Sequence, residues 1–186
     1  MIYEDITKIQ KQINMANPNV LIPFVLHYEG GFVNDPKDSG GATNKGITLN
    51  TFRSVYGRTK SVADLKKLTN EQWKHIFKTL YWDKCKADMI NDQSIANMLV
   101  DFAVNSGVSR AVKKIQKIVG VVSDGICGLQ TLSAINVGNP KQTFEKLKSA
   151  RLKYLQDVVR ASPQKAKFLK GWNKRVNAIE YGKLTY

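Results

Sequence analysis

Histidine and cysteine are scarce in this chain of 186 residues, which contains only two of each. The two histidines are too few for a convincing metal site, and Cys85 and Cys127 belong to no C-x-x-C pattern. The sequence also lacks H-E-x-x-H, the phosphate-binding pattern G-x-x-x-x-G-K-[ST], and G-x-G-x-x-G after a strand. Metal and thiol catalysis are therefore unsupported, and we expect neither a metal nor another cofactor. Pairing of the two cysteines stays open, although the pattern favours two buried free thiols.

Long apolar runs are missing as well. No stretch approaches the roughly 18 apolar residues of a membrane span. The first residues, MIYEDITKIQKQINMANP, are amphipathic and contain no continuous apolar segment of the signal-peptide type. We expect synthesis in the cytoplasm without a signal peptide, where the protein would stay unless something else exports it.

The composition is that of a soluble globular protein of one domain, with 42% apolar and 24% charged residues. Its net charge is +14, and residues 141–186 contribute nine of these charges through twelve Lys/Arg against three Asp/Glu. Such a basic region indicates either a solvated helix face or a polyanionic partner: nucleic acid, an anionic membrane or a wall polymer. Nucleic acid is disfavoured because no basic run is interleaved with aromatic residues.

Helical periodicity dominates the chain. Apolar residues recur at helical spacing from Trp73 to Tyr81, behind a capping box at Thr69, and from Ile95 to Ala103. The weaker repetitions of this pattern begin at Ile2, Leu21, Val112 after a Ser109 cap, Leu147, and Leu169 after Ser162-Pro163. The sequence thus predicts seven or eight helices.

Strand signal is confined to one place, where Phe32-Val33 and Thr43–Thr48 are expected to form a small hairpin across a glycine-rich turn. Asn105-Ser106-Gly107 is typical of a helix end and marks the only candidate boundary. We therefore predict a mostly α fold with two regions, 1–107 and 108–186, packed as one compact unit.

Glu29 is the strongest candidate for catalysis, because it stands at the predicted C-terminal end of a helix, before Gly30-Gly31. The helix dipole is negative there, and partial burial behind Tyr28 and Phe32 adds to the effect. Both would raise the pKa of the carboxyl, as a general acid near neutral pH requires. From spacing alone, a solvated residue before a glycine cap is an equally simple interpretation.

Asp35 and Asp38 follow within the glycine-rich turn, and either would supply the second carboxylate that glycoside hydrolysis usually needs. Ordinary Asx turns explain the same residues. Calcium binding fits poorly, because the D-x-D-x-D-G spacing is missing and Gly46 occupies the twelfth position from Asp35.

Asp101 and Asn105 lie four residues apart and share one face of the predicted Ile95 helix. They are candidates for lining a substrate groove. The alternative is that Asn105 caps the helix while Asp101 is solvated.

These residues together resemble a known family. The run EGGFVNDPKDSGGATNKGIT is similar to the opening motif of glycoside hydrolase family 108, the N-acetylmuramidase-like phage endolysins, and YWDKC and DFAVNSG resemble its middle. SDGICGLQTL and FLKGWNKRV resemble the peptidoglycan-binding-type module that closes such chains. The resemblance covers nearly everything from about residue 20.

The resemblance implies a lysozyme-like helical fold, a small hairpin beside the catalytic helix, and cleavage of the β-1,4 bond between N-acetylmuramic acid and N-acetylglucosamine in bacterial cell-wall lysis. Glu29 would be the catalytic acid and Asp38 the second carboxylate, ahead of Asp35. Thr43 and Thr48 would join Asp101 and Asn105 in substrate binding.

The chain departs from the family pattern at three positions. Lys45 stands where an aromatic residue is common, and Cys127 and Leu129 replace residues of a D-G-x-x-G-P stretch. A lytic transglycosylase and a non-catalytic wall-binding or secretion-accessory protein remain alternatives. The expected partner is peptidoglycan, with an anionic membrane or wall polymer as a further candidate, and we expect a monomer.

Overall fold

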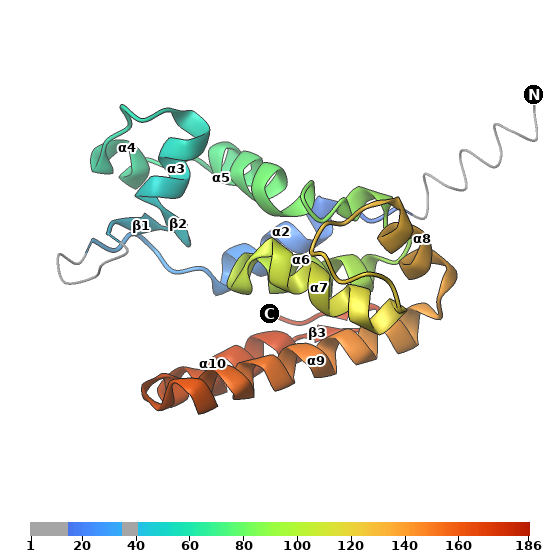
Figure 1. Cartoon of the computed structure of the whole chain (residues 1–186). Helices are drawn as coiled ribbons and strands as arrows, with labels where there is room; N and C mark the ends of the chain where they lie inside the picture. Colours follow the sequence, from blue (N-terminus) through green and yellow to red (C-terminus); the bar gives the residue numbers. More distant parts are fainter. Residues whose placement is uncertain (1–14, 35–40) are drawn as a thin grey trace, which may run out of the picture.

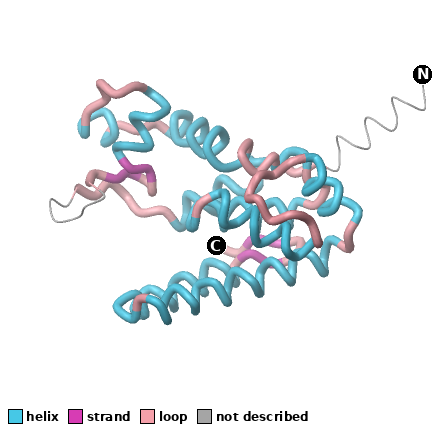
Figure 2. Tube along the Cα trace, viewed as in Figure 1, coloured by secondary structure: helices cyan, strands magenta, loops and turns pink. Residues whose placement is uncertain are grey.

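The computed structural model describes residues 15–34 and 41–186, in which other helices surround a central one (Figure 1). The first part of the chain forms α2 (Pro18–Tyr28), β1 (Thr43–Asn44), β2 (Ile47–Thr48), α3 (Leu49–Tyr56), α4 (Val62–Lys66), α5 (Asn70–Phe77), the π-helical turn η1 (Lys78–Trp82) and η2 (Ala87–Met89). The rest forms α6 (Gln93–Ser106), α7 (Val108–Val119), α8 (Leu129–Val137), α9 (Pro140–Ala161), η3 (Pro163–Lys165), α10 (Ala166–Asn177), β3 (Ile179–Glu180) and β4 (Lys183–Leu184). The predicted mostly α fold is confirmed, and the strands of residues 15–34 and 41–186 form two short antiparallel pairs (Figure 2).

Helix α6 is the centre of the core. Ten of its 14 residues are buried, on all sides of the helix, as expected of a helix enclosed by others. It packs against α7, α9, η1, η2 and β3, which draws the two halves of the chain together. Its end is set by Gly107, whose φ of 90° is unfavourable for residues with a side chain.

Two parts of the molecule project to the same side in Figure 1. One is the hairpin lobe, which we define as β1, β2, α3 and α4, and the other is the C-terminal pair of antiparallel helices, α9 and α10. The hairpin lobe is attached through Phe52 and Leu65, which are buried in the core. The arrangement leaves the end of α2 between the two projections.

The predicted hairpin is only partly as observed. Val33 and Thr43 form an isolated bridge, but the hairpin itself pairs Thr43 with Thr48 and turns at Lys45-Gly46. The short turn is possible because both turn residues adopt positive φ, 46° and 74°. The β1–β2 hairpin therefore turns at Lys45-Gly46, whereas the glycine-rich stretch lies in the chain between the bridged residues Val33 and Thr43.

Several helix boundaries also differ from prediction. The capping box at Thr69 is present, but Gly107 rather than Ser109 is the N-cap of α7. Pro163 opens the 3-10 turn η3, and Ser162 makes no side-chain cap there. The pattern beginning at Ile2 falls outside the described residues.

Candidate active site

Glu29 is positioned by the end of α2. Asn17 caps the start of this helix by accepting a hydrogen bond from the Asn19 amide, and Pro18 occupies its first turn. At the other end the Glu29 amide donates to the Val25 carbonyl while its own backbone is already extended (φ −86°, ψ 136°). The helix thus ends at Glu29 itself, and no left-handed glycine is needed to stop it.

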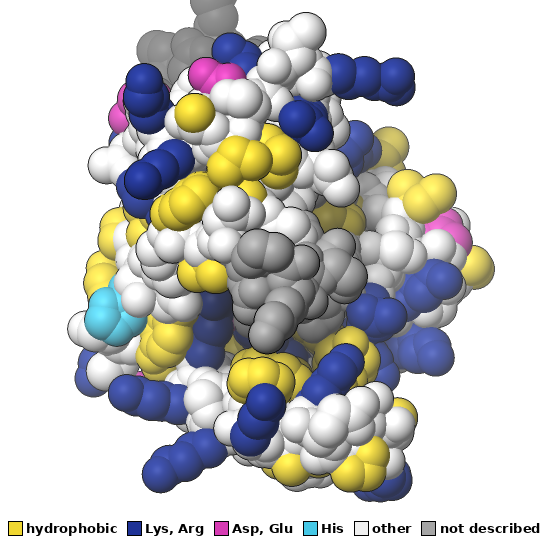
Figure 3. Space-filling model, turned by 90° about the vertical axis from the view of Figure 1, so that its left-hand side faces the viewer, with side chains coloured by type: hydrophobic (Ala, Val, Ile, Leu, Met, Phe, Trp, Pro, Cys, Tyr) yellow, Lys and Arg dark blue, Asp and Glu magenta, His cyan; other side chains and the backbone are white. Residues whose placement is uncertain are grey.

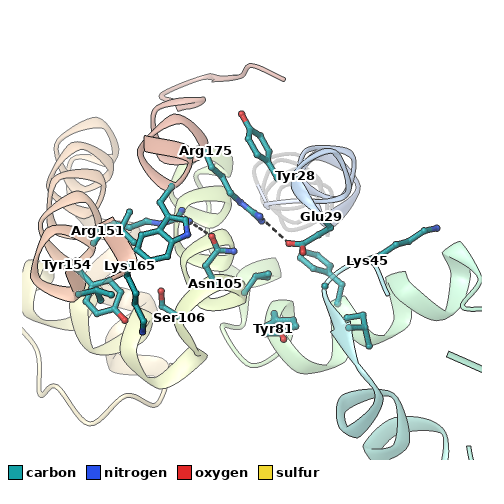
Figure 4. Close-up of a pocket in the computed structure, with 18 of the residues that line it drawn as sticks. Tyr28, Glu29, Lys45, Tyr81, Asn105, Ser106, Arg151, Tyr154, Lys165 and Arg175 are labelled. Carbon is teal, nitrogen blue, oxygen red and sulfur yellow. Dashed lines mark hydrogen bonds and ion pairs between the residues drawn. The ribbon is translucent and has the colours of Figure 1, made fainter. Parts of the chain in front are cut away.

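The side chain of Glu29 faces a pocket of about 640 Å³ between the hairpin lobe and the C-terminal helix pair (Figure 4). Aromatic rings provide much of its wall: Tyr28, Trp73, Phe77, Tyr81, Tyr154 and Trp172. Its polar lining includes Lys45, Asn105, Ser106, Arg151, Lys165 and Arg175. A concave site with aromatic walls and a few converging polar groups is typical of ligand-binding pockets.

Burial controls the protonation of Glu29, whose side chain is 16% exposed. Loss of solvent raises the pKa of this carboxyl, and the charge of Asp101 adds a smaller upward effect. Arg175 acts in the opposite direction, because its Nη1 donates to Glu29 Oε1 at 3.1 Å. The net direction is upward, so the pocket favours a protonated glutamate, as the sequence predicted.

The same arginine connects Glu29 to a second, fully buried carboxylate. Arg175 Nη2 donates to Asp101 Oδ1 at 2.7 Å, and Arg151 Nη2 donates to Asp101 Oδ2 at 2.7 Å. Burial alone would raise the pKa of Asp101, but the two guanidinium groups outweigh it and hold this pKa below its usual value. Asp101 is thus an ionised anchor for both arginines.

Asn105 completes this network at the pocket surface. Arg151 Nη2 donates to Asn105 Oδ1 at 3.1 Å. Because arginine only donates, the amide oxygen must face Arg151, and the Nδ2 donors of Asn105 are left for other partners. Asn105 is exposed and lines the pocket, so these donors are available to a ligand.

The hairpin turn approaches Glu29 from the other side. A Cβ added to Gly46 would overlap the Glu29 carboxylate, chiefly at Oε2, so only glycine fits this turn. The turn is held by Trp73, whose Nε1 donates to the Lys45 carbonyl at 2.9 Å. Lys45 itself, which replaces an aromatic residue of the family pattern, donates through Nζ to Asn70 Oδ1 at 2.7 Å.

The remaining predicted site residues are placed as follows. Asp101 is fully buried and does not line the pocket. Helices α9 and α10 cover it, and both of its carboxylate oxygens accept hydrogen bonds from arginine. Asp101 is therefore neither a groove residue nor a solvated one, and both predictions for it were wrong. Thr48 caps α3 by accepting from the Thr51 amide, and Thr43 pairs with Thr48 in the hairpin; neither lines the pocket. Asp35 and Asp38 lie outside the described residues.

Arg175 and Arg151 line the pocket, and the sequence analysis did not identify them. Arg175 lies 146 positions from Glu29, and both arginines belong to a strongly basic stretch in which nothing distinguishes a buried cation from an exposed one. The sequence analysis also did not identify the aromatic wall of the pocket. No local signal in the sequence would have separated these residues from their neighbours.

The cysteines are set apart from the pocket. Cys85 and Cys127 are both buried free thiols, as the sequence favoured. Burial raises the pKa of both, to about 11 for Cys127, which keeps the thiols neutral near pH 7. In the described part of the chain, no three His, Cys, Asp or Glu residues are grouped as metal ligands, and no helix is long and apolar enough to span a membrane.

Comparison with known proteins matches the two halves of the chain to two family models. Residues 22–107 match the model for glycosyl hydrolase 108, and residues 110–177 match a model described as a predicted peptidoglycan domain. The solved structure of Brucella abortus SagA is similar with a TM-score of 0.75 and 38% identity, over 87% of this chain and 90% of that one. No curated protein sequence matches.

Proposed function

The chain belongs to the glycosyl hydrolase 108 family, and we propose that it hydrolyses the β-1,4 bond between N-acetylmuramic acid and N-acetylglucosamine. The broader statement, that it is a peptidoglycan hydrolase with a lysozyme-like helical fold, follows from its family. The observation that carries the finer proposal is Glu29, a largely buried glutamate with a raised pKa at the wall of a pocket of about 640 Å³. A raised pKa keeps the proton on a carboxyl to higher pH, which is what donation to a glycosidic oxygen requires.

The two oxygens of Glu29 have different roles in this proposal. Oε1 accepts from Arg175, so the proton belongs on Oε2, which faces the Gly46 turn. Oε2 would protonate the leaving oxygen as positive charge develops on the adjacent sugar ring. Arg175 would then stabilise the glutamate that has lost its proton, which it already contacts.

Asp38 remains the proposed second carboxylate, with Asp35 as the alternative. Among the described residues that line the pocket, Glu29 is the only carboxylate, so the second group must come from elsewhere or be replaced by water. A separation of about 5 Å between the two carboxyls would give retention, and about 6.5 to 9.5 Å would give inversion. Asn105 is the proposed contact for a sugar amide or hydroxyl, through its free Nδ2.

The proposed setting is the bacterial cell wall, where cleavage of the glycan would lyse the cell. Figure 3 shows Lys and Arg side chains over much of one face of the molecule, with few acids. This charge would hold the enzyme near anionic wall polymer or membrane, an attraction that acts over a Debye length of about 8 Å at 0.15 M salt.

Product analysis tests the bond and separates the alternatives. Purified peptidoglycan is digested, and the new chain ends are identified by mass spectrometry after borohydride reduction. A muramidase leaves reduced N-acetylmuramic acid, whereas a lytic transglycosylase leaves 1,6-anhydro ends that resist reduction. New N-acetylglucosamine reducing ends would place the cut at the other linkage and reject the proposal. Binding without any new ends would favour the wall-binding or secretion-accessory alternative.

A further inference from the structure

A second cavity, of about 420 Å³, lies against α7 and is lined by cations. Its charged lining residues are Arg110, Lys113, Lys114 and Lys117, and the rest of its wall is Ser106, Gly107 and Ser109. The four cations occupy positions i, i+3, i+4 and i+7 of one helix, so they share a face. We call this feature the basic groove.

The basic groove carries its charge without compensation from the described part of the chain. None of its four cations forms an ion pair with a carboxylate there, although like charges three and four apart on a helix repel one another. Asp124 is close enough to Lys113 for that charge to contribute to its lowered pKa, but its carboxylate accepts hydrogen bonds from Gln116 and the Ile126 amide. Ion pairs with other described side chains therefore do not account for this cluster of positive charge.

The basic groove continues from the active-site pocket. Ser106 lines both cavities. The guanidinium of Arg110 lies 5.2 Å from the centre of the Tyr154 ring, which lines the pocket, and its Nη1 donates to the Ser106 carbonyl at 2.6 Å. In Figure 4, Ser106 and Tyr154 lie at the end of the pocket away from Glu29. A polymer bound at Glu29 would thus lead toward the groove.

We propose that the basic groove binds the carboxylates of the stem peptides attached to the glycan strand, a binding site additional to the one that holds the sugars. The inference rests on the proposed function, because a peptidoglycan strand carries a peptide on each muramic acid through its lactyl group. These peptides project from the strand and bear free carboxylates, whereas the sugar rings themselves offer only neutral groups. Lysine and arginine side chains recognise such carboxylates by charge-assisted hydrogen bonds.

The test uses a charge-matched pair of triple variants. K113Q/K114Q/K117Q removes three cations of the groove, and K84Q/K141Q/K146Q removes three exposed cations that line neither cavity. Both sets carry Glu29→Gln so that the polymer is not digested. Binding is measured by co-sedimentation at 0.15 M salt with sacculi from which teichoic acid and protein have been removed. The sacculi are coupled to beads through their sugar hydroxyls, so that the glycan strands still sediment after their peptides are removed. One batch keeps its stem peptides, and the other has lost them to an amidase that leaves the lactyl carboxylate in place.

On intact sacculi, we expect the groove variant to bind about tenfold more weakly than its Glu29→Gln parent and the control variant to bind about as well as that parent. On stripped sacculi, all three proteins should bind alike. If both triple variants lost the same amount of binding, the groove lysines would act only through the net charge of the protein, and the inference would be overturned. A groove-specific loss that persists on stripped sacculi would also overturn it, because the ligand would then be the strand itself.

Hydrolysis by the same triple variants with Glu29 restored separates this inference from the proposed function. If the inference holds, the groove variant has a raised KM on peptide-bearing strands and an unchanged KM on stripped strands. Should no variant and no wild-type protein cleave either substrate, the proposed function fails, while the binding comparison still decides the ligand of the groove.

Discussion

The end of α2 and the middle of α6 each hold a shielded carboxylate, and the two behave in opposite ways. Glu29 contacts one arginine and keeps one side on the pocket, whereas Asp101 contacts two arginines and has no exposed surface. Burial raises the pKa of Glu29 despite Arg175, but the two arginines together lower that of Asp101. Burial alone therefore does not determine whether the pKa of a carboxyl is raised; the number of cations around the carboxyl determines the direction of the shift.

Arg175 contacts both carboxylates and forms more hydrogen bonds with Asp101 than with Glu29. It donates to Asp101 from both Nε and Nη2 and reaches Glu29 only through Nη1. The buried aspartate thus fixes the guanidinium in position and takes up part of its positive charge. Glu29 receives one hydrogen bond from this guanidinium, and its pKa is still raised because burial outweighs the effect of Arg175.

The largest effect should follow from removing the anchor with Asp101→Asn. Two buried arginines would lose their carboxylate, and breaking a buried ion pair of this kind typically costs about 3–5 kcal/mol. Urea unfolding at pH 7 measures the change. The control is Asp157→Asn, which removes an exposed pair with Arg160 and should cost less than about 1 kcal/mol. Equally small losses of unfolding free energy in Asp101→Asn and Asp157→Asn would show that Asp101 does not stabilise the two arginines.

The stability lost in Asp101→Asn should also depend on pH. The pKa of Asp101 is lower in the folded protein, so its contribution to stability is present above the pKa of the unfolded state and is lost as pH falls through the folded value. The difference between wild type and Asp101→Asn should therefore shrink in acid. Glu29, with its raised pKa, has the opposite sign, and Glu29→Gln should gain stability relative to wild type as pH rises through the folded value.

Gly46→Ala should disturb Glu29 while leaving Asp101 intact. The new Cβ would displace the Glu29 carboxylate, so we expect hydrolysis to fall by about 100-fold, the loss typical of a misplaced catalytic group. Gly182→Ala is the control, since this residue has a similar φ of 80° in the β3–β4 turn and open space around it. Both variants should lose about 1–3 kcal/mol of stability from backbone strain. Comparable activity in Gly46→Ala and Gly182→Ala would show that the Gly46 turn does not lie against the Glu29 carboxylate.

Removing the shared arginine should also cost stability, because Asp101 loses a buried partner, but its effect on catalysis should be the smallest, a shift in pH dependence. Without Arg175 the pKa of Glu29 loses its main downward influence. In Arg175→Gln the high-pH fall of kcat/KM, which reports loss of the proton from Glu29, should therefore move to higher pH. Arg160 is an exposed residue of α9, so Arg160→Gln makes the same change of charge and should leave the high-pH fall of kcat/KM where it is. A shift toward lower pH would mean that Arg175 does not stabilise the ionised carboxylate.

The sequence anticipated the region around Glu29 better than the region around Asp101. Helix ends and caps depend on neighbouring residues, so the end of α2 and the Thr69 capping box were predictable. Helical spacing also placed Asp101 and Asn105 on one face correctly. What covers that face depends on Arg151 and Arg175, which lie 50 and 74 positions from Asp101, and no local pattern reports such packing.

The most direct test of the account is hydrolysis of purified peptidoglycan by the wild type and by Glu29→Gln, followed as the release of reducing ends. Both proteins are first shown to be folded by circular dichroism and by a cooperative melting transition. The account predicts cleavage by the wild type and a rate at least about 100-fold lower for Glu29→Gln, since the amide has no proton to donate. Equal rates for the two folded proteins would contradict it and place the acid elsewhere.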